Sequence, residues 1–205
     1  MNLIGHSGKV FNMKRLLLIL ILTLSFQSLI KAEDIRDFEI EGISIGNSLL
    51  NYLSEKEIKV LSISPYTFRY PNNSYITLTT PNPGYEIYNR VSVVLKVNDK
   101  NYIIKALEGM FSYGDKIHKC YEKQKIISQD IETAFRDKFD KDEWNGKYGS
   151  DKSGKSKVKY IDYEFTEGSA IRIICYDMDK DFIDPNDQLT VAINSIEFMK
   201  YLMNR

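Results

Sequence analysis

The sequence is poor in histidine, which limits the metal and acid–base chemistry open to it. It has two histidines in 205 residues, and His6 lies in the N-terminal segment that has the pattern of a targeting signal. Zinc sites in proteins commonly use two or three histidine ligands. Cys120 is a nearby thiol, but residues two apart on a helix point to nearly opposite faces. We therefore predict no metal site at His118 and interpret this residue as a surface or capping residue.

Common catalytic and nucleotide-binding motifs are also missing. The sequence has no Gly-x-Ser-x-Gly elbow and no His-Glu-x-x-His pair, which are signatures of widespread hydrolases. The turn "GISIG", from Gly42 to Gly46, lacks both the Gly-Lys-Ser/Thr of a phosphate loop and the third glycine of a dinucleotide-binding turn. We interpret it as a strand-to-helix connection. The sequence predicts no catalytic residue, no cofactor and no bound metal.

The chain has no uninterrupted apolar run of the roughly 20 residues that a transmembrane helix needs. Its most apolar stretch, Leu16 to Phe26, follows the basic pair Lys14 and Arg15 and precedes a small residue, Ala32. A basic start, an apolar middle and a small residue in this order are typical of a secretory signal peptide. We therefore predict a signal peptide over residues 1–32.

Met13 is the expected true start, and cleavage after Ala32 would leave a single domain over residues 33–205. The alternative is an uncleaved N-terminal anchor, because Ile30 occupies a position where a small side chain is preferred. With cleavage we expect a periplasmic or extracellular protein that has no membrane span.

A concentrated basic surface is absent too. The whole chain balances 28 Lys and Arg against 28 Asp and Glu, but four of the basic residues and no acidic one lie in residues 1–32. The remainder is mildly acidic, which argues against a nucleic-acid partner. The Lys-rich run Lys147 to Lys159 also holds glycines, serines and Asp151, so we interpret it as a solvated loop.

Cysteine is limited to Cys120 and Cys175. An even number of cysteines in an exported protein indicates a disulfide. Cys120 falls in register with Ile127 and Ile131 on a predicted helix, and Cys175 alternates with Ile173 on a predicted strand. Both side chains should face the core, and we predict that they are bonded. Two separate buried thiols are the alternative.

Apolar periodicity predicts both strands and helices. Residues 37–45 alternate as a half-buried strand does, and Asn47 or Ser48 would cap the helix that follows. Ser54 and Glu57 form a capping box that starts a second short helix. Three hairpins are expected, at 66–79, 88–113 and 158–176, and a last strand near 189–193. The longest helix is expected at 117–135 and is followed by a polar loop at 137–157. Asn194 and Glu197 form a capping box that predicts a C-terminal helix.

This order predicts an α+β fold in which helices pack on antiparallel hairpins. Helix and then hairpins occur twice before a closing helix, so the domain could consist of two similar halves, 33–113 and 114–205.

Two stretches resemble known groups of proteins. "FEIEGISIGNSLLNYLSEKEI", from Phe38 to Ile58, resembles the opening of small secreted modules of the beta-lactamase-inhibitor-like type. That resemblance implies a strand, a glycine turn and a helix pair on an antiparallel sheet, in proteins that bind other proteins or serve envelope assembly. "DKSGKSKV…YEFTEGSAIRIICYDM…LTVAINSIEFMKYL" resembles uncharacterised secreted proteins of small-genome marine bacteria, which implies no activity.

Two further stretches suggest ligands. In "DMDKDFIDPNDQ", Asp177, Asp179 and Asp181 match the first ligand positions of a calcium loop, but Phe182 replaces the required glycine and Gln188 the bidentate glutamate. We predict a solvated acidic loop and no tight calcium site.

An aromatic group made of Tyr66, Phe68, Tyr70 and Tyr75 is a candidate binding surface. The alternative is that these rings fill a sheet–helix interface.

Together these observations predict an exported, non-enzymatic protein that binds a protein or a component of the cell envelope. The alternative is a small secreted hydrolase that uses acidic residues, since such residues are plentiful and no motif excludes it.

Overall fold

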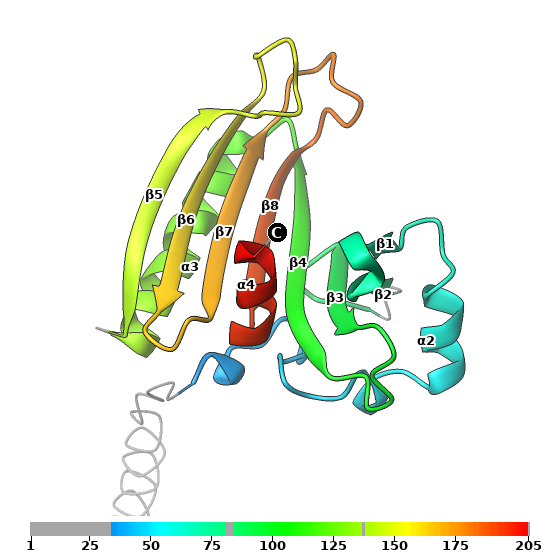
Figure 1. Cartoon of the computed structure of the whole chain (residues 1–205). Helices are drawn as coiled ribbons and strands as arrows, with labels where there is room; N and C mark the ends of the chain where they lie inside the picture. Colours follow the sequence, from blue (N-terminus) through cyan, green and yellow to red (C-terminus); the bar gives the residue numbers. More distant parts are fainter. Residues whose placement is uncertain (1–33, 81–83, 137, 205) are drawn as a thin grey trace, which may run out of the picture. The chain divides into compact units, whose positions relative to one another are not determined.

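The computed structural model describes residues 34–80, 84–136 and 138–204, so the predicted signal peptide lies outside the described residues. The described residues contain one antiparallel sheet with the strand order β1-β2-β3-β4-β8-β7-β6-β5 (Figure 1). Its strands are β1 (Phe68–Arg69), β2 (Tyr75–Thr80), β3 (Arg90–Lys96), β4 (Ile104–Gly114), β5 (Phe139–Lys147), β6 (Lys157–Phe165), β7 (Ala170–Asp177) and β8 (Asp187–Asn194).

Three α-helices and three short 3₁₀ helices complete the described part of the chain. They are α2 (Glu55–Leu61), α3 (Ile117–Phe135), α4 (Ile196–Met203), η1 (Ile35–Asp37), η2 (Leu49–Asn51) and η3 (Pro71–Asn73). No helix among the described residues is both long and apolar enough to cross a membrane. The predicted α+β class with an antiparallel sheet and a C-terminal helix is confirmed.

The three predicted hairpins form, as β1–β2, β3–β4 and β6–β7. Short polar connections and runs of β-branched residues place their strands side by side. The centre of the sheet is different, because β4 pairs with β8 and these strands are far apart in sequence.

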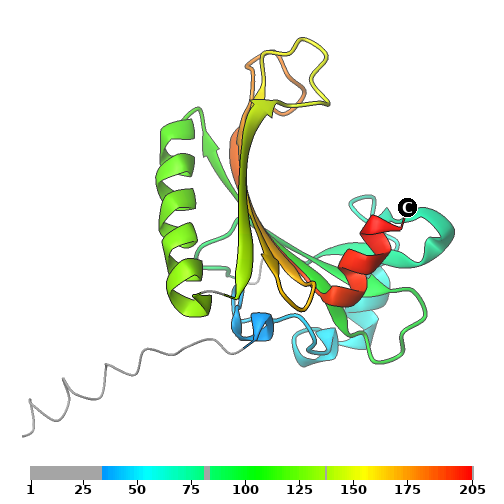
Figure 2. The same ribbon diagram turned by 60° about the vertical axis from the view of Figure 1, so that its left-hand side comes forward.

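Helix α3 covers one face of the sheet, where it contacts β7, β8 and β4. Figure 2 shows it along the convex side of the curved sheet, with α4 on the other side. Its buried side chains recur at helical spacing and are Cys120, Gln124, Ile127, Ser128, Ile131 and Phe135. Gln124 Nε2 donates to the carbonyl oxygens of Lys159 at 3.1 Å and Ile173 at 2.9 Å, so the helix is fixed to the sheet by polar as well as apolar contacts.

The strand expected at residues 37–45 does not form. Glu41 and Gly42 have φ angles of 54° and 74°, and this left-handed turn brings Ile40 back to pair with Ile43. The isoleucines of the segment are buried because an irregular chain packs on the sheet. Gly46 likewise has a φ of 84°. The "GISIG" segment therefore follows a turn and not a strand, and it leads to the short 3₁₀ helix η2, so only the strand part of the predicted strand-to-helix connection was wrong.

The helix starts are only partly as predicted. Ser48 accepts from Leu50 N at 3.2 Å and starts η2, and the Ser54 and Glu57 capping box starts α2 as predicted. The Asn194 and Glu197 box is wrong: Asn194 ends β8, and Ser195 caps α4. Glu197 instead forms ion pairs with basic residues of β3 and β4.

The polar loop expected at 137–157 contains strand β5. Its side chains are charged on both sides of the strand, because β5 lies at the edge of the sheet and is largely exposed, so no alternation of apolar residues marks it. The loop proper is 148–156. There Asp151 accepts from the backbone N–H groups of Ser153 and Ser156, each at 2.8 Å. The predicted solvated loop at Lys147 to Lys159 is therefore right only in its middle.

Candidate functional site: the open face of the sheet

The two faces of the sheet are covered to different extents. Side chains alternate along a strand, so Ile173 and Cys175 of β7 face α3 while Ile174 and Tyr176 point to the other side. On that other side α4 packs through Phe198 against residues of β2, β3 and β4 only. We call the remainder of this side, on β5, β6, β7, β8 and β4, the open face. No helix of the described chain covers it.

An apolar row crosses the open face. The register aligns, from edge to centre, Trp144, Tyr160, Ile174, Thr190, Met110 and Arg90. The rings of Trp144 and Tyr160 are stacked with centroids 5.4 Å apart, and 43% of Trp144 is exposed. A stacked, partly exposed aromatic pair offers a flat apolar surface to a partner.

A polar row runs beside the apolar row. Its aligned residues are Asp142, Asp162, Arg172, Ala192, Glu108, Ser92 and Thr79. Arg172 donates through two nitrogens to Asp162, which raises the pKa of the guanidinium. The same guanidinium lies 4.8 Å from the centre of the Tyr160 ring, so it links the two rows.

The centre of the open face holds polar groups that are poorly satisfied. Burial raises the pKa of Glu108, although the charge of Arg90 acts in the opposite direction, and no hydrogen bond to its carboxylate occurs within the described residues. Thr190 Oγ1 is buried and has no hydrogen-bond partner among them. Burial, and then the Glu108 charge, raises the pKa of Tyr176 to about 12. Buried groups of this kind are more frequent at binding sites than elsewhere.

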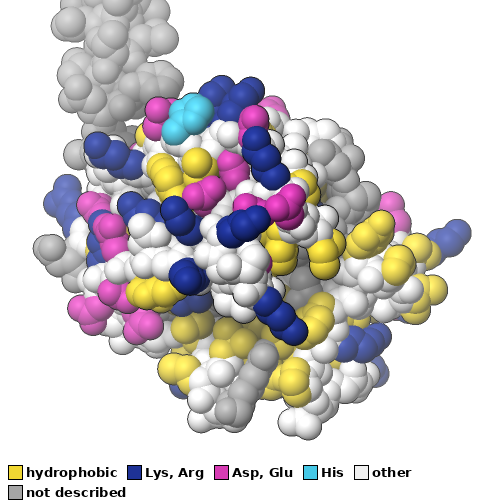
Figure 3. Space-filling view, turned by 90° about the horizontal axis from the view of Figure 1, so that it is seen from above, with side chains coloured by type: hydrophobic (Ala, Val, Ile, Leu, Met, Phe, Trp, Pro, Cys, Tyr) yellow, Lys and Arg dark blue, Asp and Glu magenta, His cyan; other side chains and the backbone are white. Residues whose placement is uncertain are grey.

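Two loops border the upper end of the open face. Tyr148 packs edge-on against Tyr176 at 5.6 Å and against Phe182 at 5.9 Å. Viewed from above, basic and acidic side chains are interspersed over this end of the molecule (Figure 3). Three packed aromatic rings, of Tyr148, Tyr176 and Phe182, therefore form the upper border of the open face, and charged side chains of the loops surround them.

The calcium-like stretch belongs to one of these loops. Lys155 Nζ lies 3.5 Å from Asp179 Oδ1 and 3.1 Å from Asp181 Oδ2, so one ammonium group pairs with both carboxylates and balances half of their charge. Among the described residues no group of three or more His, Cys, Asp or Glu side chains has the arrangement of a metal site. That calcium does not bind tightly here remains a prediction.

The predicted aromatic surface is only partly assembled. Phe68 and Tyr70 meet edge-on at 4.9 Å, and Tyr70 reaches Tyr75 at 6.5 Å. Tyr75 is 4% exposed and packs on Phe198 of α4, as the interface alternative implied. Phe68 and Tyr66 are 55% and 78% exposed. Two of the four rings are therefore available to a partner from the side of β1.

The predicted pairing of Cys120 with Cys175 is confirmed in the structure, with a Cα separation of 5.9 Å. Both residues are fully buried beneath α3, on the face of the sheet opposite to the open face. The pair therefore stabilises the site from behind and takes no direct part in it.

The sequence interpretation missed the residues of the open face. Trp144 lies in the predicted polar loop, and Glu108 and Arg172 lie within predicted hairpins, where no motif distinguishes them. One signal was present: in β6, Tyr160 and Asp162 alternate with the core residues Ile161 and Tyr163. Which strands lie beside β6 could not be read from that pattern.

Comparison of the chain with protein-family models, with curated proteins and with solved structures found no match.

Proposed function

We propose that this is an exported binding protein that holds a protein or envelope partner on the open face. The observation that carries the proposal is the uncovered pair of rows, in which stacked rings lie beside charged groups and the buried Thr190 hydroxyl has no partner within the described residues. A surface with large rings and an arginine has the composition of a protein interface.

Export is supported by two independent features. The signal-peptide pattern of residues 1–32 directs the chain out of the cytoplasm. The buried pair Cys120 and Cys175, at disulfide distance, is compatible with an oxidising compartment. We therefore place the protein in the periplasm or outside the cell.

We also infer that the domain consists of two related halves. Helix α2 precedes β1 to β4 and helix α3 precedes β5 to β8, and the last strand of each set, β4 or β8, lies at the centre of the sheet. This arrangement joins two four-stranded units into one broad surface. The exposed rings of Tyr66 and Phe68 would extend the binding surface past α4 onto the first half.

The hydrolase alternative has less support. The polar row contains Asp162 and Glu108, but β7 and β8 lie between their strands. Three strand spacings put their backbones roughly 14 Å apart. The paired carboxyl groups of glycosidases are separated by about 5–9.5 Å. The backbones of this pair are therefore farther apart than that separation. Asp142 and Asp162 are closer, because they align on neighbouring strands, but Asp162 is already paired with Arg172 through two nitrogens.

Site-specific photo-crosslinking tests the proposal. A photoreactive phenylalanine analogue replaces Ile174 on the open face or, as a matched control, Ile126, an exposed isoleucine of α3 on the other side of the sheet. Each variant of the full chain is produced in the native host and irradiated. We expect a discrete adduct from position 174 and none from position 126. Adducts from position 126 alone, or from neither position, would contradict the proposal.

A further inference from the structure

Strand β5 has an unpaired edge. It is nine residues long, pairs with β6 on one side, and is the last strand in the sheet order. No segment of the described chain pairs with its other side. Edge strands are common sites of pairing with another chain, unless bulges, prolines, charged side chains or very short length prevent it. The charges of β5 oppose pairing with a chain of like charge pattern, so they restrict the partner to one of complementary charge. The register of β5 is continuous over its whole length, and the strand contains no proline.

The register identifies the free backbone groups. Thr166 N donates to Lys138 O, which makes the aligned residues Phe139 and Phe165 a non-hydrogen-bonded pair. Hydrogen-bonded and non-hydrogen-bonded pairs alternate along an antiparallel ladder. The N–H and C=O groups of Lys141, Glu143 and Asn145 therefore point away from β6, towards the unpaired edge.

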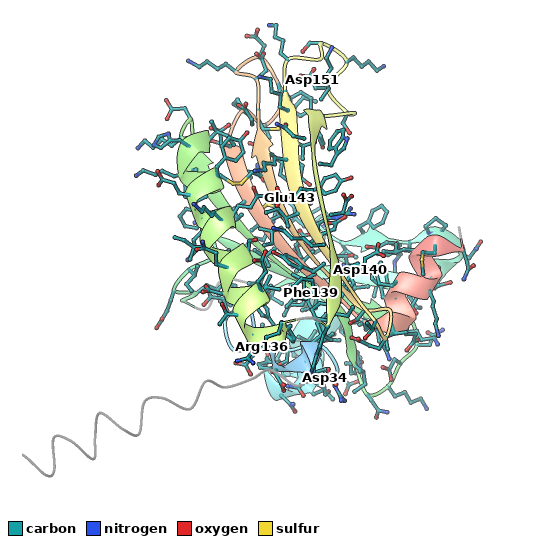
Figure 4. The ribbon with its side chains drawn as sticks, turned by 90° about the vertical axis from the view of Figure 1, so that its left-hand side faces the viewer. Asp34, Arg136, Phe139, Asp140, Glu143 and Asp151 are labelled. Atoms are coloured by element: carbon teal, nitrogen blue, oxygen red, sulfur yellow. A yellow bond between two sulfur atoms is a disulfide. The ribbon has the colours of Figure 1, made fainter. Side chains whose placement is uncertain are left out.

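The side chains on the open-face side of β5 are Asp140, Asp142 and Trp144, since they align with Glu164, Asp162 and Tyr160. Figure 4 shows Asp140 and Phe139 on opposite sides of the strand. Both aspartates are exposed, and neither takes part in a hydrogen bond or an ion pair within the described residues. A strand added to this edge would meet two unpaired negative charges and an aromatic ring.

The α3 side of β5 is occupied in a different way. Lys141 Nζ contacts Glu132 at 2.9 Å and Glu143 at 2.7 Å. Lys141 is therefore neutralised within the chain. Lys147, the other cation on this side, lies at the end of the strand, so the charge left along the middle of β5 is the negative charge on the open-face side.

A second copy of the chain fits this edge poorly. A two-fold axis perpendicular to the sheet would pair β5 with β5 of a second copy in antiparallel orientation. Aligned residues then lie on the same face, and the residue on the axis lies opposite the same residue of the other copy. Centring on Asp140, Lys141, Asp142 or Glu143 puts like charges opposite each other, and centring on Trp144 aligns Lys141 with Lys147. Centring on Asn145 aligns opposite charges, Glu143 with Lys147, but it confines strand-to-strand pairing to residues 143–147 and leaves Asp140 and Asp142 opposite the loop that follows β5. Like charges directly opposite are destabilising.

We infer that the edge of β5 binds an extended basic peptide segment of a partner protein by antiparallel strand addition. Its backbone pairs with Lys141, Glu143 and Asn145, and its cationic side chains lie opposite Asp140 and Asp142. An aromatic or arginine side chain lies opposite Trp144. In strand addition the backbone supplies affinity and alternate side chains supply specificity. The inference rests on the proposed function, because it names the segment of the partner that is recognised.

Peptide titration is the first test. The probe is a blocked seven-residue peptide, Thr-Tyr-Thr-Arg-Thr-Arg-Thr, and its control has Glu in place of Arg. Binding to the exported protein, purified from cells that produce the full chain, is followed by Trp144 fluorescence, since the chain has a single tryptophan. We expect the Arg peptide alone to bind, and more weakly as salt rises. Equal binding of both peptides, or of neither, would overturn the inference.

Matched variants locate the charge effect. Asp140→Asn with Asp142→Asn should weaken binding of the Arg peptide by roughly 2- to 30-fold, since cross-strand charge pairs contribute modestly. The control, Glu122→Gln with Asp130→Asn, removes two exposed acids from α3 and should leave binding unchanged. Equal weakening in both variants would indicate a general charge effect and would contradict strand addition.

Hydrogen exchange tests the backbone pairing. Bound peptide should slow exchange of the amides of Lys141, Glu143 and Asn145, with little change at Asp142 and Trp144, which face β6. A peptide N-methylated at alternate residues on its pairing edge should not bind. Protection elsewhere, or a dimer of the chain formed through β5, would overturn the inference. If strand addition at β5 is wrong but the open face still binds a partner, crosslinks from position 174 will still form. The two proposals can therefore fail independently.

Discussion

Two glutamates of this chain have opposite electrostatic surroundings. Burial raises the pKa of Glu108 on the open face. Glu41 is subject to some burial as well, but its carboxylate accepts from the backbone N–H groups of Tyr88, Glu86 and Ile87 at 2.8, 2.9 and 2.8 Å, and its pKa is lowered overall. The two residues should therefore make stability depend on pH in opposite directions.

The Glu108→Gln variant should be more stable than the wild type at neutral pH. The unfolded chain ionises at this residue near pH 4.5, whereas the folded chain holds the proton to higher pH. Stability is therefore lost as pH rises from 4.5 through the raised pKa, and glutamine removes that loss. Thermal unfolding by circular dichroism should show a higher Tm than wild type at pH 7 and the same Tm near pH 4.

Glu164→Gln is the matched control, because Glu164 is an exposed acid on the same side of the sheet. It should leave the Tm unchanged at both pH values. A Glu108→Gln variant that is less stable than wild type at pH 7 would show that the ionised carboxylate has a stabilising partner.

The Glu41→Ala variant should lower the free energy of unfolding by about 1–3 kcal/mol at pH 7, because three backbone donors lose their acceptor. Since the Glu41 pKa is lowered in the folded state, its contribution is present above pH 4.5 and is lost as pH falls through the folded pKa. Urea unfolding at several pH values measures this. Glu39→Ala is the control, since within the described residues Glu39 accepts only from the Ser44 hydroxyl, at 3.3 Å. Equal losses in both variants would contradict the prediction.

At the scale of elements, α3 is the main support behind the open face. Cys120 joins it to β7, Gln124 donates to carbonyl oxygens of β6 and β7, and the Ser128 hydroxyl lies 2.6 Å from Tyr163 Oη. Each contact comes from the buried side of the helix, and each reaches a strand that carries open-face residues on its other side. The shape of the open face therefore depends on how α3 is attached.

Loss of the Cys120–Cys175 bond should destabilise the protein strongly. The bond closes a loop of 55 residues, which corresponds to about 4 kcal/mol in the chain-entropy model, or roughly 10 °C in Tm for a domain of this size. Calorimetry of the exported protein with and without reductant measures the change, and the Cys120→Ser with Cys175→Ser variant should match the reduced protein. Two thiols that react in denaturant without reductant would contradict the bond.

At the scale of the whole molecule, the unit from Ala32 onward is compact in itself. Its core is continuous across both sets of strands, since residues of β3, β4, β8, β7 and β6 belong to one hydrophobic cluster. Removal of residues 1–32 should leave this core intact.

We expect the exported protein to begin at Glu33 and to fold without the preceding segment. Mass spectrometry of the secreted or periplasmic fraction locates the N-terminus. A Lys14→Glu and Arg15→Glu variant, which lacks the basic start of the signal, should stay in the cytoplasm with its cysteines reduced. Full-length chain retained in the inner membrane would instead indicate an uncleaved anchor.

Local pattern predicted much of the fold and little of the site. The period of Cys120, Ile127 and Ile131 predicted α3 because one face of that helix is buried. Strand β5 was missed because an exposed edge strand has no buried face to produce a period. The turn at Glu41 and Gly42 was missed because the buried isoleucines of this irregular segment alternate with other residues in the sequence, as they would in a strand.

The sequence by itself determined the α+β class, the three hairpins, the long helix, and the inward direction of both cysteines. These features depend on contacts between residues close in the chain, whose spacing is visible in the sequence. Only the tertiary structure decided that β4 pairs with β8, that Trp144, Tyr160 and Arg172 meet on one uncovered face, and that β5 keeps a free edge. The physical reason is that strand order and register arise from packing between distant segments, and one residue of register changes which face a side chain occupies.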